Sequence, residues 1–166
     1  MPLTPFHLGP GLFFGMITFR FFDLVAFLVG STLLDIEPAC LILYNLNYPY
    51  LSYSHHGVLH SFLLGVIIAL LIALILNNYK EKISRYLGKF NLSQKSSFLS
   101  IFSGALLGDW IHLVFDSFMH YDVFPFWPSH FNPLLNLISI PQNYFLCSAL
   151  GIAGLILLII KVKKHD

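Results

Sequence analysis

Long apolar stretches dominate the pattern of hydrophobic and polar positions along the chain. Two of them, 58–76 and 143–160, contain almost no polar residue. Both are long enough to span a bilayer as a helix, which takes about 20 residues. A third stretch, 98–119, is equally apolar apart from three ionisable residues. The pattern therefore predicts at least three membrane-spanning helices.

The apolar stretch 10–34 is interrupted by Arg20 and Asp23, and it allows two interpretations. The segment 4–34 could form one helix, or it could form a hairpin of two short helices that turns near 19–23. We favour the hairpin because it places Arg20 at the same end of the protein as the other cations. Each arm would hold about 14–17 residues, enough to span where the bilayer thins locally. Asp23 would then cap the second arm by accepting amide hydrogens of its first turn.

The nine Lys and Arg residues are concentrated in few places, and this distribution predicts the orientation. Besides Arg20, they lie in the segment 77–97 and at the C-terminus. Because Lys and Arg favour cytoplasmic segments, we expect both regions on the cytoplasmic side. The Lys-free segments 35–57 and 120–142 then lie on the opposite side. We expect 77–97 to be a loop attracted to anionic lipid, with a short amphipathic helix as the alternative.

These patterns predict an all-α polytopic membrane helix bundle that forms a single domain over residues 1–166. We expect about five transmembrane helices, with the N-terminus outside and the C-terminus inside, at 4–18, 22–34, 57–76, 98–120 and 142–161.

Composition supports a location in a membrane. The chain is 57% hydrophobic and only 10% charged, whereas soluble domains carry about 25% charged residues. A net charge of +1 gives no reason to expect nucleic acid as a partner. The two cysteines, Cys40 and Cys147, stand alone and far apart, which argues against a disulfide framework or a cysteine-based zinc site.

Ionisable residues inside a membrane are expensive and usually functional. On the helix expected at 98–120, Asp109, His112, Asp116 and His120 follow one another at spacings of three, four and four. At 100° per residue they share one face of the helix. They form a column of potential ligands that rises toward the non-cytoplasmic end. Imidazole together with carboxylate suits zinc, manganese or iron better than calcium.

Other segments bring similar residues to the same predicted level. His7 begins the first arm, and Asp35 and Glu37 end the second. His60 lies near the start of the helix expected at 57–76, and either His55 or His56 could face the site beside it.

We therefore expect a site for two divalent metal ions, most simply zinc, with a third as the alternative. The predicted ligands are His7, Asp35, His55, His60, His112 and Asp116. Further candidates are Glu37, His56, His120 and Asp122. Among the catalytic candidates, Asp35 would orient or deprotonate a water molecule, and Asp109 would orient a ligand histidine.

Four motifs in order resemble those of the predicted membrane-bound metal-dependent hydrolases, which include the YdjM-like inner-membrane proteins. They are Thr4-Pro5-Phe6-His7, Leu34-Asp35-Ile36-Glu37-Pro38, His55-His56-Gly57-Val58-Leu59-His60-Ser61 and the Gly108 to Asp116 helix with His112. The stretch Pro125-Phe126-Trp127-Pro128 follows them, and the resemblance covers about residues 1–135. Relatives usually have Pro-Asp-Ile-Asp where this chain has Leu34 to Glu37, and Arg in place of His56. The His-x3-Asp helix is also distantly similar to that of zinc-dependent phospholipases C and P1-type nucleases, which hold three zinc ions.

The resemblance implies a metal-dependent hydrolase of the cytoplasmic (inner) membrane. With a site at the membrane surface, we expect a phosphoester of a lipid or a lipid-linked molecule as substrate, cleaved at the non-cytoplasmic face. Two other functions remain open: a metal-binding protein that conducts metal ions or protons, and a structural protein whose polar cluster only joins helices. A conductor needs polar groups through the whole membrane thickness.

Overall fold

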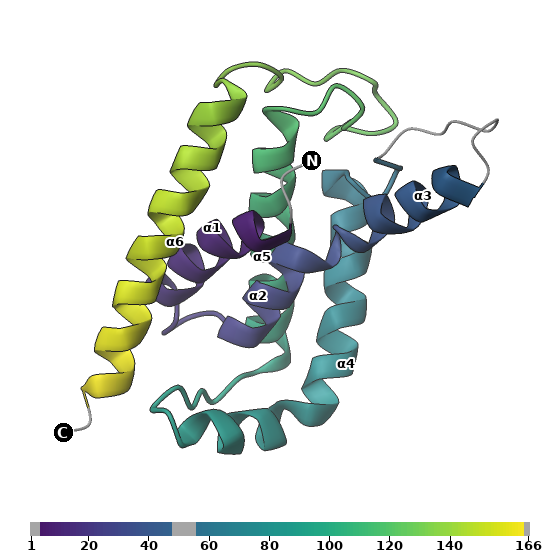
Figure 1. Cartoon of the computed structure of the whole chain (residues 1–166). Helices are drawn as coiled ribbons and strands as arrows, with labels where there is room; N and C mark the ends of the chain where they lie inside the picture. Colours follow the sequence, from purple (N-terminus) through teal and green to yellow (C-terminus); the bar gives the residue numbers. More distant parts are fainter. Residues whose placement is uncertain (1–3, 48–55, 165–166) are drawn as a thin grey trace.

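The computed structural model describes residues 4–47 and 56–164, and its regular structure is entirely helical in these ranges. Figure 1 shows the arrangement, with α5 inside the bundle and α6 along one side. The helices are α1 (Thr4–Ile17), α2 (Leu24–Leu33), α3 (Ile36–Asn47), α4 (Phe62–Gly88), α5 (Phe98–Ser117) and α6 (Ile140–Lys163).

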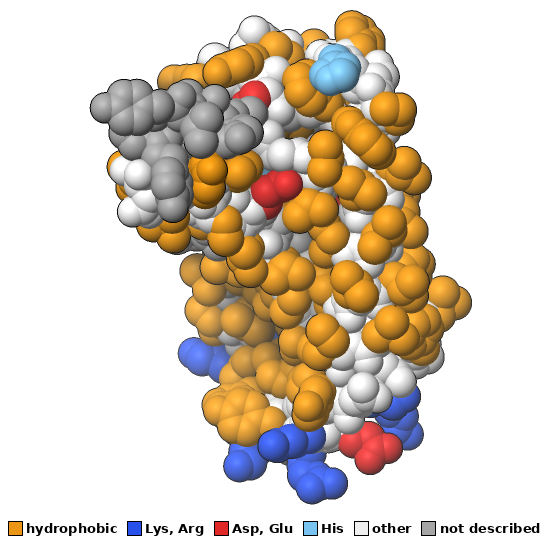
Figure 2. All heavy atoms as spheres, turned by 90° about the vertical axis from the view of Figure 1, so that its right-hand side faces the viewer, with side chains coloured by type: hydrophobic (Ala, Val, Ile, Leu, Met, Phe, Trp, Pro, Cys, Tyr) orange, Lys and Arg blue, Asp and Glu red, His pale blue; other side chains and the backbone are white. Residues whose placement is uncertain are grey.

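Four helical segments are long and apolar enough to cross a membrane, and α1 is a shorter apolar helix. The four are Leu24–Tyr44, Phe62–Gly88, Phe98–Ser117 and Ile140–Lys163. Figure 2 shows a broad hydrophobic surface above an end at which Lys and Arg side chains gather. These features confirm the predicted polytopic helical membrane bundle.

The predicted hairpin is confirmed, because the chain leaves the helix between Ile17 and Leu24 and α1 packs against α2. Asp23 caps α2 as expected: its carboxylate accepts a hydrogen bond from the Ala26 amide at 2.8 Å. The Gln94 side chain stabilises the turn between α1 and α2 by donating hydrogen bonds to the carbonyl oxygens of Phe19 and Phe22.

Small residues let the helices approach α5 closely, as is common in membrane bundles. A Cβ on Gly30 of α2 would collide with the backbone carbonyl of Ala105 in α5, and a Cβ on Gly108 would collide with that of Phe27. Helix α5 also packs against α1 and α4, whereas α6 attaches mainly to α1. Ala105 also belongs to a fully apolar core cluster, formed by Ala26, Ala69, Ile72, Ala73, Ile101 and Ala105.

Helix α3 was not predicted, and Pro38 explains why α2 does not simply continue into it. Proline has no amide hydrogen to donate to the carbonyl four residues earlier, and its ring crowds that carbonyl. The Leu34 carbonyl accepts from the Glu37 amide instead, at 3.1 Å. The helix is therefore interrupted at Leu34 and Asp35, and α3 turns away from the bundle (Figure 1).

The predicted limits of the third transmembrane helix, 57–76, differ from the structure at both ends. Helix α4 begins at Phe62, after Ser61, whose hydroxyl accepts a hydrogen bond from the Leu64 amide. It continues to Gly88, so the first half of the expected loop 77–97 is helical and bends across the end of the bundle (Figure 1). Only the remainder of that segment, beyond Gly88, is a connection.

Replacing Gly30 by Ala should destabilise the protein, because every close neighbour of the new methyl group is α5 backbone. We expect a loss of about 1–3 kcal/mol, as for other overpacked sites. Gly88→Ala is the matched control, since its Cβ would meet only the Ser93 side chain at 3.7 Å. Thermal unfolding in detergent measures both variants. Equal stability of the two would contradict the close α2–α5 contact.

The orientation can be tested with single cysteines in a Cys40→Ser/Cys147→Ala background. Tyr121→Cys lies after α5 and Lys163→Cys at the Lys-rich end, and both positions are exposed. We expect a membrane-impermeant maleimide to label only the cysteine at 121 in intact cells, because cationic segments favour the cytoplasm. Labelling of the cysteine at 163 alone would invert the orientation.

Candidate metal centre

The side chain of Asp116, near the end of α5, is the centre of a buried cluster and is only 1% exposed. Five imidazoles surround it, each with its Nε2 atom near a carboxylate oxygen. The distances are 3.1 Å for His7, 3.1 Å for His112, 3.6 Å for His60, 3.9 Å for His56 and 3.9 Å for His120.

These histidines come from four separate parts of the chain. His7 lies in the first turns of α1, and its ring stacks on that of His112 at 3.9 Å between centroids. His56 and His60 lie in the irregular segment before α4, and His120 follows the end of α5. The Phe62 amide donates to the Pro125 carbonyl at 2.9 Å, which joins the last two segments. The cluster therefore depends on tertiary folding rather than on one motif.

Most of the converging ring nitrogens have no hydrogen bond among the described residues. This is true of the Nε2 atoms of His7, His60, His112 and His120. They lie near Asp116 without the geometry of a hydrogen bond. Because buried polar groups are normally paired, an orphan set of this size asks for an explanation. A cation placed between the nitrogens and the carboxylate would supply the missing partner.

The opposite nitrogens of three rings are held by oxygen atoms. His112 Nδ1 lies 2.9 Å from the Ser31 carbonyl, and His60 Nδ1 lies 2.7 Å from a Glu37 oxygen. His56 Nδ1 lies 3.0 Å from Asp122. If each Nδ1 carries the hydrogen, each Nε2 turns a lone pair toward Asp116. Metal-binding histidines usually have such an outer acceptor, which fixes both tautomer and ring orientation.

The ligand atoms fall into three groups that could each hold one ion, with the atoms of a group within 4.8 Å of one another. The first group has four members and would satisfy a tetrahedral ion without water. The other two have three members each, which leaves a position open. Asp116 and His56 each belong to two groups. The groups are His7/Asp35/His112/Asp116, His56/His60/Asp116 and His56/His120/Asp122.

Charge also favours divalent cations in this cluster. Asp35, Asp116 and Asp122 are all at least 90% buried, and isolated buried carboxylates are strongly unfavourable. Burial lowers the pKa of His120 to about 4, and burial and the nearby His60 lower the pKa of His56. Both imidazoles are therefore neutral at pH 7 and keep a lone pair for coordination. The donor set fits zinc or a similar transition metal.

The structure brings together most of the residues singled out from the sequence. His7, Asp35, His60, His112 and Asp116 are in the groups, and so are three of the further candidates, His56, His120 and Asp122. His55 lies outside the described residues. Glu37 belongs to none of the three groups and instead holds His60.

Asp109 is buried in α5 but belongs to none of the three groups. Neither of its carboxylate oxygens makes a hydrogen bond to a described residue, and a Cβ on Gly65 of α4 would collide with one of them. No hydrogen bond to a described residue therefore supports the prediction that Asp109 orients a ligand histidine. That role falls to Glu37, Asp122 and the Ser31 carbonyl.

The sequence did not predict the Ser31 carbonyl as a partner of His112, because every residue has a backbone carbonyl and the residue type does not indicate which one accepts. It also placed His56 and His60 on one helix. The structure shows them before Ser61, where their rings still meet at 4.8 Å. The spacing found the correct residues although the local conformation differs.

Comparison with known families gives one result. The family model described as YdjM inner membrane protein matches residues 4–164. None of the curated proteins and none of the solved structures matches the chain.

Detergent-purified protein should contain more than one divalent ion per chain. Asp116→Asn should lose ions from two groups because this carboxylate is shared, whereas Asp35→Asn should affect only the first group. His130→Ala is the control, since His130 is exposed and outside the groups. Elemental analysis gives the stoichiometry. Less than one ion per chain in the wild type would refute the metal centre.

Proposed function

This chain belongs to the YdjM family of inner membrane proteins, and on that premise we propose that it is a metal-dependent hydrolase of lipid phosphoesters. The observation that carries the proposal is the convergence of unpaired imidazole nitrogens on the shared, buried Asp116. Many enzymes that hydrolyse phosphoesters hold two or more metal ions side by side in the active site.

Two or three divalent ions, most simply zinc, would activate water for attack and stabilise charge on the phosphoryl oxygens. In the chain itself, Asp116 joins two groups and fixes their relative positions. Glu37 and Asp122 orient His60 and His56. The Oδ2 atom of Asp35 is buried without a hydrogen bond, and its other oxygen lies 3.8 Å from His112. Asp35 is thus available to accept a proton from water.

The surroundings of the centre favour a lipid as substrate. Ile36, which separates Asp35 from Glu37, is 56% exposed, and Val58 and Leu59 beside His60 are 50% and 40% exposed. Apolar side chains at such positions would contact acyl chains in a bilayer. Figure 2 shows acidic side chains surrounded by a hydrophobic face on this side of the molecule. A head group could therefore approach the metal centre while its acyl chains remain in the membrane.

The apolar core cluster argues against the alternative of a metal or proton conductor. Its six members, drawn from α2, α4 and α5, are at most 4% exposed and lie on the side of the centre toward the Lys-rich end. Beyond Asp109, an ion leaving the centre in that direction would meet this apolar cluster among the described residues. Conduction needs polar groups across the membrane.

Purified protein in nanodiscs should hydrolyse at least one member of a phosphodiester panel that includes fluorescent phospholipids. A chelator should abolish the activity and zinc should restore it. Asp35→Asn should lower kcat by roughly 100-fold or more, the contribution expected of a general base. His130→Ala should leave the rate unchanged.

The conductor hypothesis predicts a different outcome. Metal-loaded protein that hydrolyses no substrate in the panel, yet dissipates a zinc or proton gradient across proteoliposomes, would contradict the proposed hydrolase.

A further inference from the structure

A second polar cavity lies at the Lys-rich end, far along the bundle from the metal centre. Its volume is about 640 Å³. Cations and neutral polar groups dominate its wall, and no acidic residue lines it among the described residues. The polar members include Arg20, Ser93, Gln94, Lys95, Ser97 and Lys161.

The three cations of this cavity come from three different parts of the chain. Arg20 belongs to the α1–α2 turn, Lys95 to the connection before α5, and Lys161 to the last turns of α6. Lys161 is held in place, since its Nζ lies 4.7 Å from the centroid of the Phe19 ring. Three positive charges brought to one cavity by folding repel one another unless an anion joins them.

The cavity has a fixed polar floor. Gln94 accepts from the Leu24 amide at 2.9 Å and donates to the Phe19 and Phe22 carbonyls. The Ser100 hydroxyl donates to the Phe21 carbonyl at 3.1 Å. These bonds tie the turn that carries Arg20 to the segment that carries Lys95. The segments that carry Arg20 and Lys95 are thus fixed relative to each other before any ligand arrives, which lowers the entropy that binding must overcome.

Asp23 lies next to the cavity, through its bond with Ser96, but does not line it. Asp23 is 9% exposed, and its two oxygens accept hydrogen bonds from the Ala26 amide and the Ser96 hydroxyl. The described lining of the cavity therefore carries three cations and no carboxylate, and it includes the hydroxyl groups of Ser93 and Ser97.

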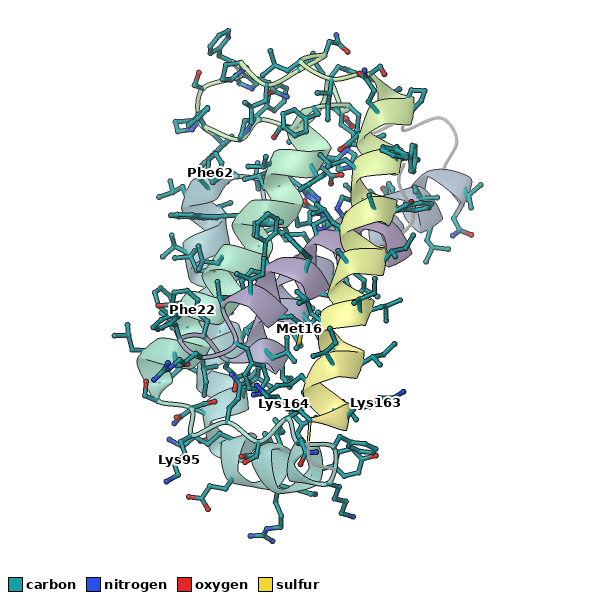
Figure 3. All side chains as sticks on the ribbon, turned by 90° about the vertical axis from the view of Figure 1, so that its left-hand side faces the viewer. Met16, Phe22, Phe62, Lys95, Lys163 and Lys164 are labelled. Atoms are coloured by element: carbon teal, nitrogen blue, oxygen red, sulfur yellow. The ribbon has the colours of Figure 1, made fainter. Side chains whose placement is uncertain are left out.

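We propose that this cavity binds the phosphate of an anionic phospholipid head group. The cavity lies between the α1–α2 turn and the segment that carries Lys95, at the Lys-rich end of the molecule (Figure 3). Phe21 in its wall is 70% exposed and can contact acyl chains. Basic cavities between transmembrane helices on a cytoplasmic face are suited to such head groups. The bound lipid would join α6 to the α1–α2 turn.

The test compares two triple variants that remove the same charge. Arg20→Gln/Lys95→Gln/Lys161→Gln removes the cavity cations. Lys82→Gln/Lys89→Gln/Lys163→Gln removes three exposed cations that do not line it. Figure 3 shows Lys163 pointing away from the side of the molecule where Lys95 lies. Native mass spectrometry of delipidated protein with added phosphatidylglycerol or phosphatidylcholine gives the lipid affinity.

We expect the cavity variant to lose phosphatidylglycerol affinity about fivefold per cation, roughly 100-fold in total. The control variant should lose much less, and phosphatidylcholine should bind weakly to all three proteins. Equal losses in both variants, or none in the cavity variant, would overturn the proposal. Matching thermal unfolding of the lipid-free proteins verifies that the variants fold.

A soluble anion is the other source of phosphate. Inorganic phosphate titrated into delipidated protein should raise the unfolding temperature less than phosphatidylglycerol does. Equal stabilisation by inorganic phosphate, lost in the cavity variant, would retain a phosphate site but overturn the assignment to a lipid.

Discussion

The arrangement of the bundle at the end opposite the Lys-rich end depends on the buried carboxylate of Asp116. Five imidazoles approach it from α1, from the segment before α4, from α5 and from the segment after α5. A buried negative charge with unpaired nitrogens around it is unfavourable by itself. Divalent cations would convert the same arrangement into a stabilising one, since each ion would pair at once with the carboxylate and the ring nitrogens. Metal binding would therefore be coupled to folding in this part of the chain.

Helix packing sets the precision of this convergence. Gly30 and Gly108 bring the backbones of α2 and α5 into contact, so that the Ser31 carbonyl reaches His112. The interruption before Pro38 then turns Asp35 and Glu37 toward the centre, where one joins a ligand group and the other holds His60. Small residues and one proline thus fix the positions of the side chains that form the candidate metal centre.

The two ends of the protein carry opposite chemistry, and the apolar core cluster separates them. Carboxylates and imidazoles gather at one end, whereas Arg20, Lys95 and Lys161 meet at the other. This separation fits a protein that works at one membrane face and is held by lipid at the other. It fits a conductor poorly, because Ile72, Ile101 and the alanines around them form an apolar cluster beyond Asp109 in the described part of the chain.

The sequence by itself determined the helical membrane class, the hairpin and the shared face of His112 and Asp116 on α5. These follow from hydrophobic run lengths, from the position of Arg20 and from the 3.6-residue period, all of which are local properties. Only the tertiary structure decided that His56, His120 and Asp122 join the centre, that Glu37 rather than Asp109 orients a histidine, and that α3 exists. Those residues lie in irregular segments or at a kink, where no period reports the direction of a side chain. Their positions depend on contacts between distant parts of the chain, such as the bond between Phe62 and Pro125.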